Sequence, residues 1–391
     1  MKLTTLRRDS LIARELARIG LARAVVDLKN DLIMDYRPDE ENPMGQPFDG
    51  PADLWRQFES KEDIEISKDR RYSAAVVEEE SKLCLNRLGP NQLEVLKMAI
   101  RQLGTRESEA ENIAQAIYDW MDPDTRPVGG EGEDEVAYYS EQLARRQKIR
   151  WNEDMALVRP KNDYYTTLEE LLLVPGMTPE LYYGFDPADE KAALEREKDL
   201  ADGKPAAKGL RDLFTVDSQE FLNLNGAGVE AMTALFGAML RDEKEGRKVA
   251  EDVFQARGEG RSSSRSLDND KAFKTIEDAQ RAMGPSGPLL VASSQAYLPL
   301  KVTASRFSIR ATGQILDSRG DPRVTRELGA IVERKLPSFM IRDDIEDRRQ
   351  RRGDMSRFEQ RMEELKDDWK ANKNTGVYQV PIVRALRWFE Y

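Results

Sequence analysis

The stretch from Asp119 to Gly184 constrains the fold of this chain more than any other part of the sequence. A helical pattern ends near Asp119 and is followed by a loop rich in glycine and carboxylates. The next helix stops at Pro175-Gly176 and another begins at Thr178-Pro179, because Pro and Gly interrupt helices while Thr caps them and Pro suits their first turn. Helical patterns with short breaks extend from about Asn91 to Leu240, so this part is predicted to be a helical block.

The composition excludes several kinds of chemistry. The 391 residues suffice for two to three domains, and they include no histidine, which removes the usual general base and the commonest zinc ligand. The single cysteine, Cys84, rules out an intrachain disulfide and is interpreted as a small core residue. The net charge of −11 repels phosphate backbones, which argues against nucleic acid as the main partner and is compatible with hard cations.

The N-terminal region is predicted to form a long helix from about Asp9 to Met34, with Asp9-Ser10 as its N-cap. Arginines interrupt its apolar residues, so it lacks the run of about 20 apolar residues that a membrane span needs. No signal peptide pattern is visible. The apolar residues that share one broad face at helical spacing are Ile12, Leu16, Ile19, Val26 and Ile33.

Two groups of β-forming segments flank the helical block. The first is a predicted hairpin of Glu62–Ser67 and Tyr72–Val77. The second group lies after the block, with a turn predicted at Ser318–Pro322. Its predicted strands are Leu289–Thr303, Phe307–Leu316, Arg323–Arg334 and a β-like run within Val377–Trp388.

Two further segments are dominated by charge. Arg241–Pro288 has a centre rich in Gly and Ser and is predicted to be a flexible linker or loop. Ile341–Lys370 is predicted to be a very polar helix, whose charges indicate a solvated face.

Five motifs in a fixed order carry a resemblance to a known family. They are Val76–Asn86, Ile117–Asp124 with the acidic loop and Tyr138-Tyr139, Arg159–Asn162 with Leu168–Gly176, Leu222–Ala227, and Ser293-Ser294 before an aromatic strand. Two positions depart from the family pattern, since Cys84 stands where Asn is usual and Gly226 where Thr is usual. On these motifs the sequence resembles the large minor pseudopilin of bacterial type II secretion, the general secretion pathway protein K family.

The resemblance implies an α+β fold, in which a long pilin-like N-terminal helix packs on a small antiparallel sheet and a large helical domain, helix-hairpin-helix or SAM-like, interrupts the sheet. The expected parts are residues 1–90 for the helix and first strands, 91–287 for the inserted domain with a flexible 241–287 segment, and 288–391 for the return to the sheet with an inserted polar helix at about 341–371. The strands from Ile64 to Val77 should then share one sheet with those after Leu289.

The resemblance also implies a non-catalytic role at the tip of the pseudopilus, where the protein initiates or caps assembly for export of folded proteins across the outer membrane. Expected partners are the minor pseudopilins I and J and, as a further candidate, the major pseudopilin. The residues expected to contact them are Ile12, Leu16, Ile19 and Val26.

Members of this family enter the membrane through a leader and a hydrophobic half-helix, and this chain begins at or after that point. The expected location, on the periplasmic side of the inner membrane, therefore depends on an N-terminal segment absent from this sequence.

The acidic loop after Asp119 is the candidate metal site. Oxygen ligands without His or Cys suit Ca²⁺, although the spacing is not that of an EF-hand and a solvated acidic loop is the alternative. The resemblance favours calcium, because related K subunits bind it in the corresponding loop. A glycosidase-type acid–base pair of Asp122 and Asp124 is disfavoured, because carboxylates so close in an acidic cluster are usually ligands or solvated. The candidate ligands are Asp122, Asp124, Glu131, Glu133, Asp134 and Glu135.

The turn at Leu173–Pro179 suggests an alternative function, a cytosolic helix-hairpin-helix protein that binds nucleic acid through backbone N–H groups at a helix start. Thr178 stands where the DNA-binding form commonly has a second Gly, Pro179 has no N–H to donate, and Glu180 repels anions. The sequence therefore favours a helical hairpin used for packing.

Overall fold

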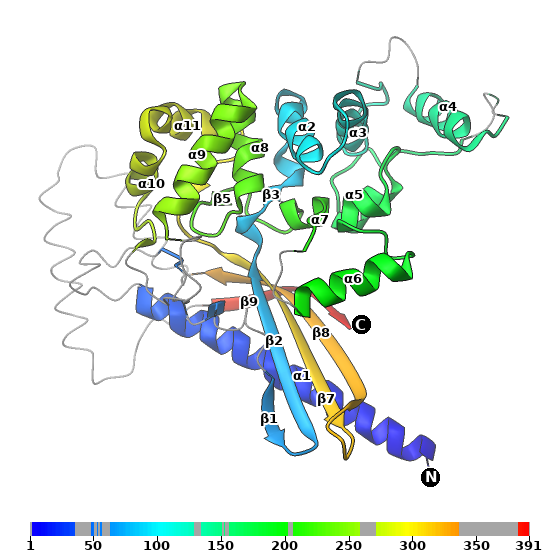
Figure 1. Ribbon diagram of the computed structural model, residues 1–391, viewed down its shortest axis with the longest axis vertical. Coiled ribbons are helices and arrows are strands. Elements are labelled where there is room, and N and C mark those ends of the chain that lie inside the picture. Colours follow the sequence, from blue (N-terminus) through cyan, green and yellow to red (C-terminus); the bar gives the residue numbers. More distant parts are fainter. Residues whose placement is uncertain are drawn as a thin grey trace, which may run out of the picture. The chain divides into compact units, whose positions relative to one another are not determined.

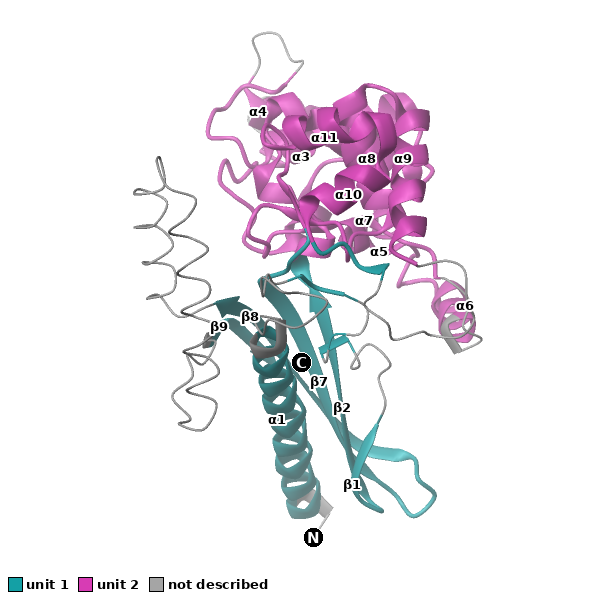
Figure 2. Ribbon diagram, turned by 90° about the vertical axis from the view of Figure 1, so that its left-hand side faces the viewer, with its two compact units in different colours: residues 1–79, 265–274, 302–391 teal, residues 80–264, 275–301 magenta. Residues whose placement is uncertain are grey.

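The computed structural model describes residues 2–35, 48–50, 53, 55–56, 63–128, 134–150, 152, 156–201, 206–258, 271–335 and 382–390. The chain forms two compact units, shown in Figure 2. The sheet unit comprises residues 1–79, 265–274 and 302–391, and the helical unit comprises residues 80–264 and 275–301.

The sheet unit is one helix on a five-stranded antiparallel sheet. The helix is α1 (Lys2–Asp35), and the sheet has the order β1-β2-β7-β8-β9. Its strands are β1 (Ile64–Ser67), β2 (Arg70–Glu78), β7 (Arg306–Leu316), β8 (Pro322–Lys335) and β9 (Ile382–Glu390), labelled in Figure 1. The predicted hairpin, the two long later strands and the turn between them are confirmed.

Pairing of β2 with β7 joins chain segments on either side of the helical unit. The register runs from Arg70 opposite Ile315 to Glu78 opposite Phe307, along the whole of β2. The prediction that early and late strands share one antiparallel sheet is confirmed.

Helix α1 covers one face of this sheet with a stripe of small and medium apolar residues. Its Ala17, Leu21, Ala24 and Leu28 are buried in one core cluster with residues of β2, β7 and β8. Gly313 on β7 permits the close approach, since a Cβ there would lie 2.0 Å from the carbonyl oxygen of Ala13. Burying each leucine stabilises the unit by about 2 kcal/mol.

The apolar residues predicted to share one face of α1 have different environments in the structure. Ile19 and Val26 are 44% and 50% exposed, whereas Leu16 is buried against the unit's own sheet and Ile12 is partly buried. The side chain of Ile33 lies outside the described residues. Alanines such as Ala17 and Ala24 occupy much of the contact between α1 and the sheet, because the helix packs closely on the strands there.

The predicted N-cap at Asp9-Ser10 is also wrong, because α1 already begins at Lys2. Asp9 is a buried residue within α1, and its carboxylate accepts a hydrogen bond from Arg323 of β8. Arg326 Nε donates to Ser10 Oγ at 2.8 Å. These polar residues therefore attach α1 to β8.

A buried ion-pair network fixes the other end of α1. The Arg334 guanidinium donates through Nη1 to Asp31 Oδ2 at 2.8 Å and through Nη2 to Asp49 Oδ1 at 2.6 Å. All three side chains are at most 5% exposed. The backbone N–H of Asp49 also donates to Val302 at 2.9 Å. Arg334 thus joins α1, the 48–50 segment and β8.

The helical unit packs its core around α8 (Val229–Leu240), which contacts α2 (Leu93–Gln102), α9 (Glu243–Ala256) and α11 (Gly287–Ser294). Helices α8 and α9 meet at Gly237 and Gly246, where a Cβ on Gly246 would lie 2.4 Å from the Gly237 nitrogen. The other helices are α3 (Glu107–Asp119), α4 (Glu135–Gln147), α5 (Pro179–Tyr183), α6 (Glu190–Ala201), α7 (Leu210–Leu213) and α10 (Ile276–Ala282).

Short elements complete this unit. Cys84 is buried in β3 (Leu83–Cys84), as predicted, and β3 pairs in parallel with β4 (Phe214–Thr215). Strand β5 (Leu222–Asn223) pairs in parallel with β6 (Leu300–Lys301). The 3₁₀ helices are η2 (Glu79–Ser81), η3 (Leu85–Arg87), η4 (Pro90–Gln92), η5 (Leu168–Leu173) and η7 (Gly284–Ser286).

The predicted flexible segment 241–287 is wrong where the structure describes it. Helix α9 buries Val249, Ala250 and Val253, so a narrow apolar stripe folds although charged residues dominate the composition. The Gly- and Ser-rich centre at 259–270 lies outside the described residues.

The predicted strand at Leu289–Thr303 is also wrong in its first part. Residues through Ser294 form α11, with Pro288 in the first turn, where proline suits a helix. Only Leu300 and Lys301 are extended in β6. The predicted polar helix at 341–371 lies outside the described residues, and β9 confirms the β-like run from Ile382 onward.

We predict that Arg334→Met lowers the free energy of unfolding by about 3–5 kcal/mol, because two carboxylates would stay buried without their cation. Urea unfolding followed by circular dichroism measures this loss. The matched control is Arg310→Met on the same sheet, since Arg310 is 64% exposed and its ion pair with Glu327 contributes about 1 kcal/mol or less. Equal losses in the two variants would contradict a special role for the buried network.

Candidate functional site

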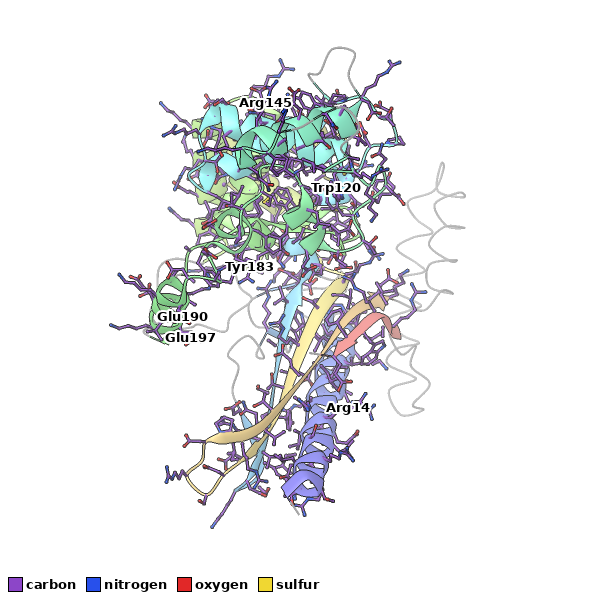
Figure 3. All side chains as sticks on the ribbon, turned by 90° about the vertical axis from the view of Figure 1, so that its right-hand side faces the viewer. Arg14, Trp120, Arg145, Tyr183, Glu190 and Glu197 are labelled. Atoms are coloured by element: carbon purple, nitrogen blue, oxygen red, sulfur yellow. The ribbon has the colours of Figure 1, made fainter. Side chains whose placement is uncertain are left out.

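Three buried carboxylates converge in the helical unit between α3 and α4. Asp119 ends α3, Asp122 lies in the turn that follows, and Glu135 is the first residue of α4. One oxygen of each lies within 4.8 Å of the others, and the residues are 0%, 6% and 1% exposed. Trp120, which directly follows Asp119 in the sequence, is labelled in the helical unit in Figure 3.

Asp119 is held in position by two donors. The Tyr139 hydroxyl donates to Asp119 Oδ2 at 2.5 Å, and the backbone N–H of Val128 lies 3.1 and 3.0 Å from the two carboxylate oxygens. Tyr139 follows Glu135 by four residues on α4, so both side chains lie on the same helix face. Asp119 therefore couples α3, the loop and α4.

Asp122 and Glu135 have buried oxygens that no described donor satisfies. Within the described residues, Asp122 Oδ1 and both Oε atoms of Glu135 are buried without a hydrogen-bond partner. Burying a carboxylate without a partner is costly, and a bound cation removes that cost. The donor set, three carboxylates without His or Cys, suits a hard cation such as Ca²⁺.

Burial shifts the protonation of the three carboxyls. Desolvation raises the pKa of Glu135 to about 8 and the pKa values of Asp119 and Asp122 to about 6 each. Neighbouring carboxylates raise these pKa values further, because like charges disfavour ionisation. At neutral pH the Glu135 carboxyl therefore holds a proton unless a cation replaces it.

The structure brings together only part of the predicted ligand set. Asp122 and Glu135 join the cluster, together with Asp119, which the ligand set had omitted. Asp124 lies outside it and accepts from the Arg126 N–H at 2.7 Å, and Asp134 caps α4 by accepting from the Val136 N–H at 2.9 Å. Glu131 and Glu133 lie outside the described residues.

Sequence reasoning missed Tyr139 as a positioning residue. Tyr139 lies one helical turn after Glu135, and this spacing would have placed both side chains on one face. The inference required the first residue of α4 to be known.

A second acidic cluster, Asp31, Asp49 and Asp53 in the sheet unit, has carboxylate oxygens within 4.8 Å of one another. Arg334 already neutralises Asp31 and Asp49, and Asp53 Oδ2 accepts from the Gly50 N–H at 2.7 Å. We therefore assign this cluster a structural role.

The turn at Leu173–Pro179 packs as a helical hairpin. Thr178 caps α5 with its own hydroxyl, which accepts from the Leu181 N–H at 3.2 Å, and Leu181 and Tyr182 are buried. Helix α5 is only five residues long and carries Glu180 in its first turn. This geometry does not favour the nucleic-acid alternative.

The fold is of the α+β class: a long helix lies on an antiparallel sheet, and a helical unit is inserted in the chain between β2 and β7. Residues 77–188, which span the carboxylate cluster and the turn at Leu173–Pro179, match the family described as "Type II secretion system (T2SS), protein K". The resemblance to protein K is thereby confirmed for this segment.

One solved structure is similar in addition. A chain in the crystal structure of the GspK–GspI–GspJ complex from the enterotoxigenic Escherichia coli type 2 secretion system is 13% identical, with 82% of this chain and 91% of that chain covered and a TM-score of 0.49. No curated protein sequence matches significantly. The assignment therefore rests on the family match.

The described part of the chain contains no helix with the length and hydrophobicity needed to cross a bilayer.

We predict that metal-free protein becomes less stable as the pH rises from about 4 to about 8. A raised carboxyl pKa means that the folded protein holds protons which the unfolded chain releases, so this stability is complete below the ordinary pKa and is lost as pH passes about 6 and then about 8. Chemical unfolding in EDTA across this range measures the loss. Glu135→Gln should flatten the upper part of the profile, and an unchanged profile in that variant would contradict the assignment.

Proposed function

We propose that this chain is a non-catalytic minor pseudopilin located at the tip of the type II secretion pseudopilus, where it initiates or caps assembly for the export of folded proteins. The observation that carries the proposal is the match of residues 77–188 to protein K. The sheet unit supports it, because strands from before and after the insertion pair in one antiparallel sheet.

The size of the inserted unit supports a position at an end of the filament. Residues 80–264 and 275–301 form a compact body of their own. A body of this size cannot be buried along the shaft of a thin filament, so the subunit that carries it belongs where the filament ends.

Partners I and J are proposed from the similar complex, which contains GspK, GspI and GspJ. The exposed side of α1 supplies apolar residues for such contacts, including Leu11, Ile19 and Val26, which are 61%, 44% and 50% exposed. Leu16 is not available for partner contacts, because it is buried in the core of the sheet unit. Ile12 is partly buried in the same cluster and is therefore less available. The major pseudopilin is a further candidate partner.

A structural role agrees with the chemistry of the described site. Its carboxylates are buried and directed at one another, and the sequence contains no histidine to act as a general base. We infer that the protein acts by assembly in the cell envelope, on the periplasmic side of the inner membrane.

We also propose that Asp119, Asp122 and Glu135 hold Ca²⁺. A bound cation would supply the charge that the buried, unpartnered oxygens lack and would fasten the end of α3 to the start of α4. Tyr139 would keep Asp119 oriented toward the ion.

Co-expression with pseudopilins I and J of the same secretion system tests the assembly proposal. We expect the three proteins to co-purify, and Ile19→Asp combined with Val26→Asp to weaken the association, because both side chains lie on the exposed side of α1. Leu173→Asp, at a residue 64% exposed in the helical unit, is the control that should leave it unchanged. Absence of any complex with the unaltered protein would overturn the proposal.

Isothermal titration of metal-free protein tests the calcium proposal. Asp122→Asn or Glu135→Gln should weaken Ca²⁺ binding roughly tenfold or more, since the number of charged ligands sets calcium affinity. Asp124→Asn is the matched control, because its carboxylate lies outside the cluster. Binding that is lost only in the control variant would refute this ligand set.

A further inference from the structure

Helix α1 and the edge strand β9 enclose an apolar groove in the sheet unit. It has a volume of about 790 Å³, and nine of the twelve residues that line it are apolar. Val25 of α1 and Val383 of β9 line one end, and at the other end Arg14 of α1 lies 2.9 Å from Glu390 of β9. Trp388 of β9 also lines the groove, and its side chain is 62% exposed. We call this feature the α1–β9 groove.

The chain leaves the described structure, and returns to it, at one end of this groove. Strand β8 ends at Lys335, which is paired with Ile382, the first residue of β9. The next residue, Val383, already lines the groove. Residues 336–381, a stretch of 46 residues outside the described part of the chain, are therefore attached at both ends beside the groove.

The sequence of this stretch contains an apolar stripe with helical spacing. From residue 355 to residue 369 the apolar residues recur every three or four positions, and the ten residues between them are all polar or charged. This spacing predicts an amphipathic helix with a single apolar face, and Asp354 is a suitable N-cap for it. A helix of this length is marginal in water unless its apolar face packs on another surface. The residues of the stripe are Met355, Phe358, Met362, Leu365 and Trp369.

The predicted helix and the groove agree in length. Residues 355–369 would extend about 21 Å as a helix, and the part of α1 from Arg14 to Val25 that lines the groove rises about 16 Å. The twelve residues 370–381 can span up to about 40 Å, so the helix could lie in the groove in either direction. Length and attachment therefore both permit the stretch to fill the groove of its own chain.

We propose that residues 355–369 form an amphipathic helix that packs in the α1–β9 groove of the same chain, with the apolar stripe against Trp388 and the other apolar residues of the lining. Attachment at both ends holds the helix beside the groove at an effective concentration on the order of millimolar, which favours it over a second copy of the chain. Ile19 and Val26 do not line the groove, so the exposed apolar residues of α1 offered to partners stay accessible. This inference does not depend on the proposed function.

Photo-crosslinking in the isolated full chain identifies the occupant. Ala22 is exposed and lines the groove, so p-benzoylphenylalanine can replace it without disturbing the core. We expect an intrachain crosslink from position 22 to residues 355–369, located by mass spectrometry of the monomer. The matched control position is Ile66 on β1, at the opposite edge of the sheet and 53% exposed, which should not crosslink to these residues. A crosslink from position 22 only to a second copy, or none, would overturn the proposal.

Accessibility of the groove provides a second test, which needs no crosslinker. In an Ala22→Cys variant the rate of maleimide labelling reports how well the groove is covered, because the native Cys84 is buried. Adding Met362→Asp should raise this rate roughly tenfold or more, since a carboxylate in the middle of the stripe would have to be desolvated for the helix to pack. Gln360→Asp is the matched control, because two residues correspond to about 200° around a helix and place it on the opposite face. Equal rates in the two variants would contradict the proposal.

Discussion

The antiparallel pairing of β2 with β7 is the interaction on which the rest of the structure depends. It closes one sheet from segments that precede and follow the helical unit, and so it permits an insertion of that size without breaking the sheet unit. The paired strands also present Ala74, Val76, Phe307 and Ile309 to α1 as a continuous apolar surface. Without this pairing α1 would lose much of the sheet surface on which it packs.

Two buried acidic clusters show two solutions to the same electrostatic problem. In the sheet unit, the guanidinium of Arg334 neutralises Asp31 and Asp49 from within the chain, and the network can be complete without a ligand. In the helical unit, no described Lys or Arg forms an ion pair with Asp119, Asp122 or Glu135, and Asn162 is the one described side chain whose hydrogen bonding lowers the pKa of Glu135. Buried carboxylates must be protonated or compensated, and in the second cluster, unlike the first, the described residues supply no cationic side chain to compensate them.

Much of the secondary structure follows from local pattern. The alternation in Tyr72–Val77 and the turn between Phe307–Leu316 and Arg323–Arg334 predicted strands correctly, because period-two alternation and turn residues act over a few positions. Prediction failed where charge or β-branched residues masked a helix, as in α9 and α11. The sequence pattern also left open which residues of α1 are buried, because the close approach of helix and sheet at Gly313 depends on segments far apart in the chain.

By itself, then, the sequence determined the existence of the long helix, the main strands, the acidic composition of the loop and the order of motifs that resembles protein K. Only the tertiary structure decided which carboxylates meet. Asp119 belongs to the cluster although the predicted ligand set omitted it, whereas the predicted ligands Asp124 and Asp134 lie outside it. The start of α4 sets which side chains point inward and which accept hydrogen bonds from nearby backbone N–H groups. It likewise decided which residues of α1 remain exposed for a partner. The burial of side chains and the convergence of carboxylates depend on contacts between segments that are distant in the chain. Local sequence periodicity does not specify those contacts.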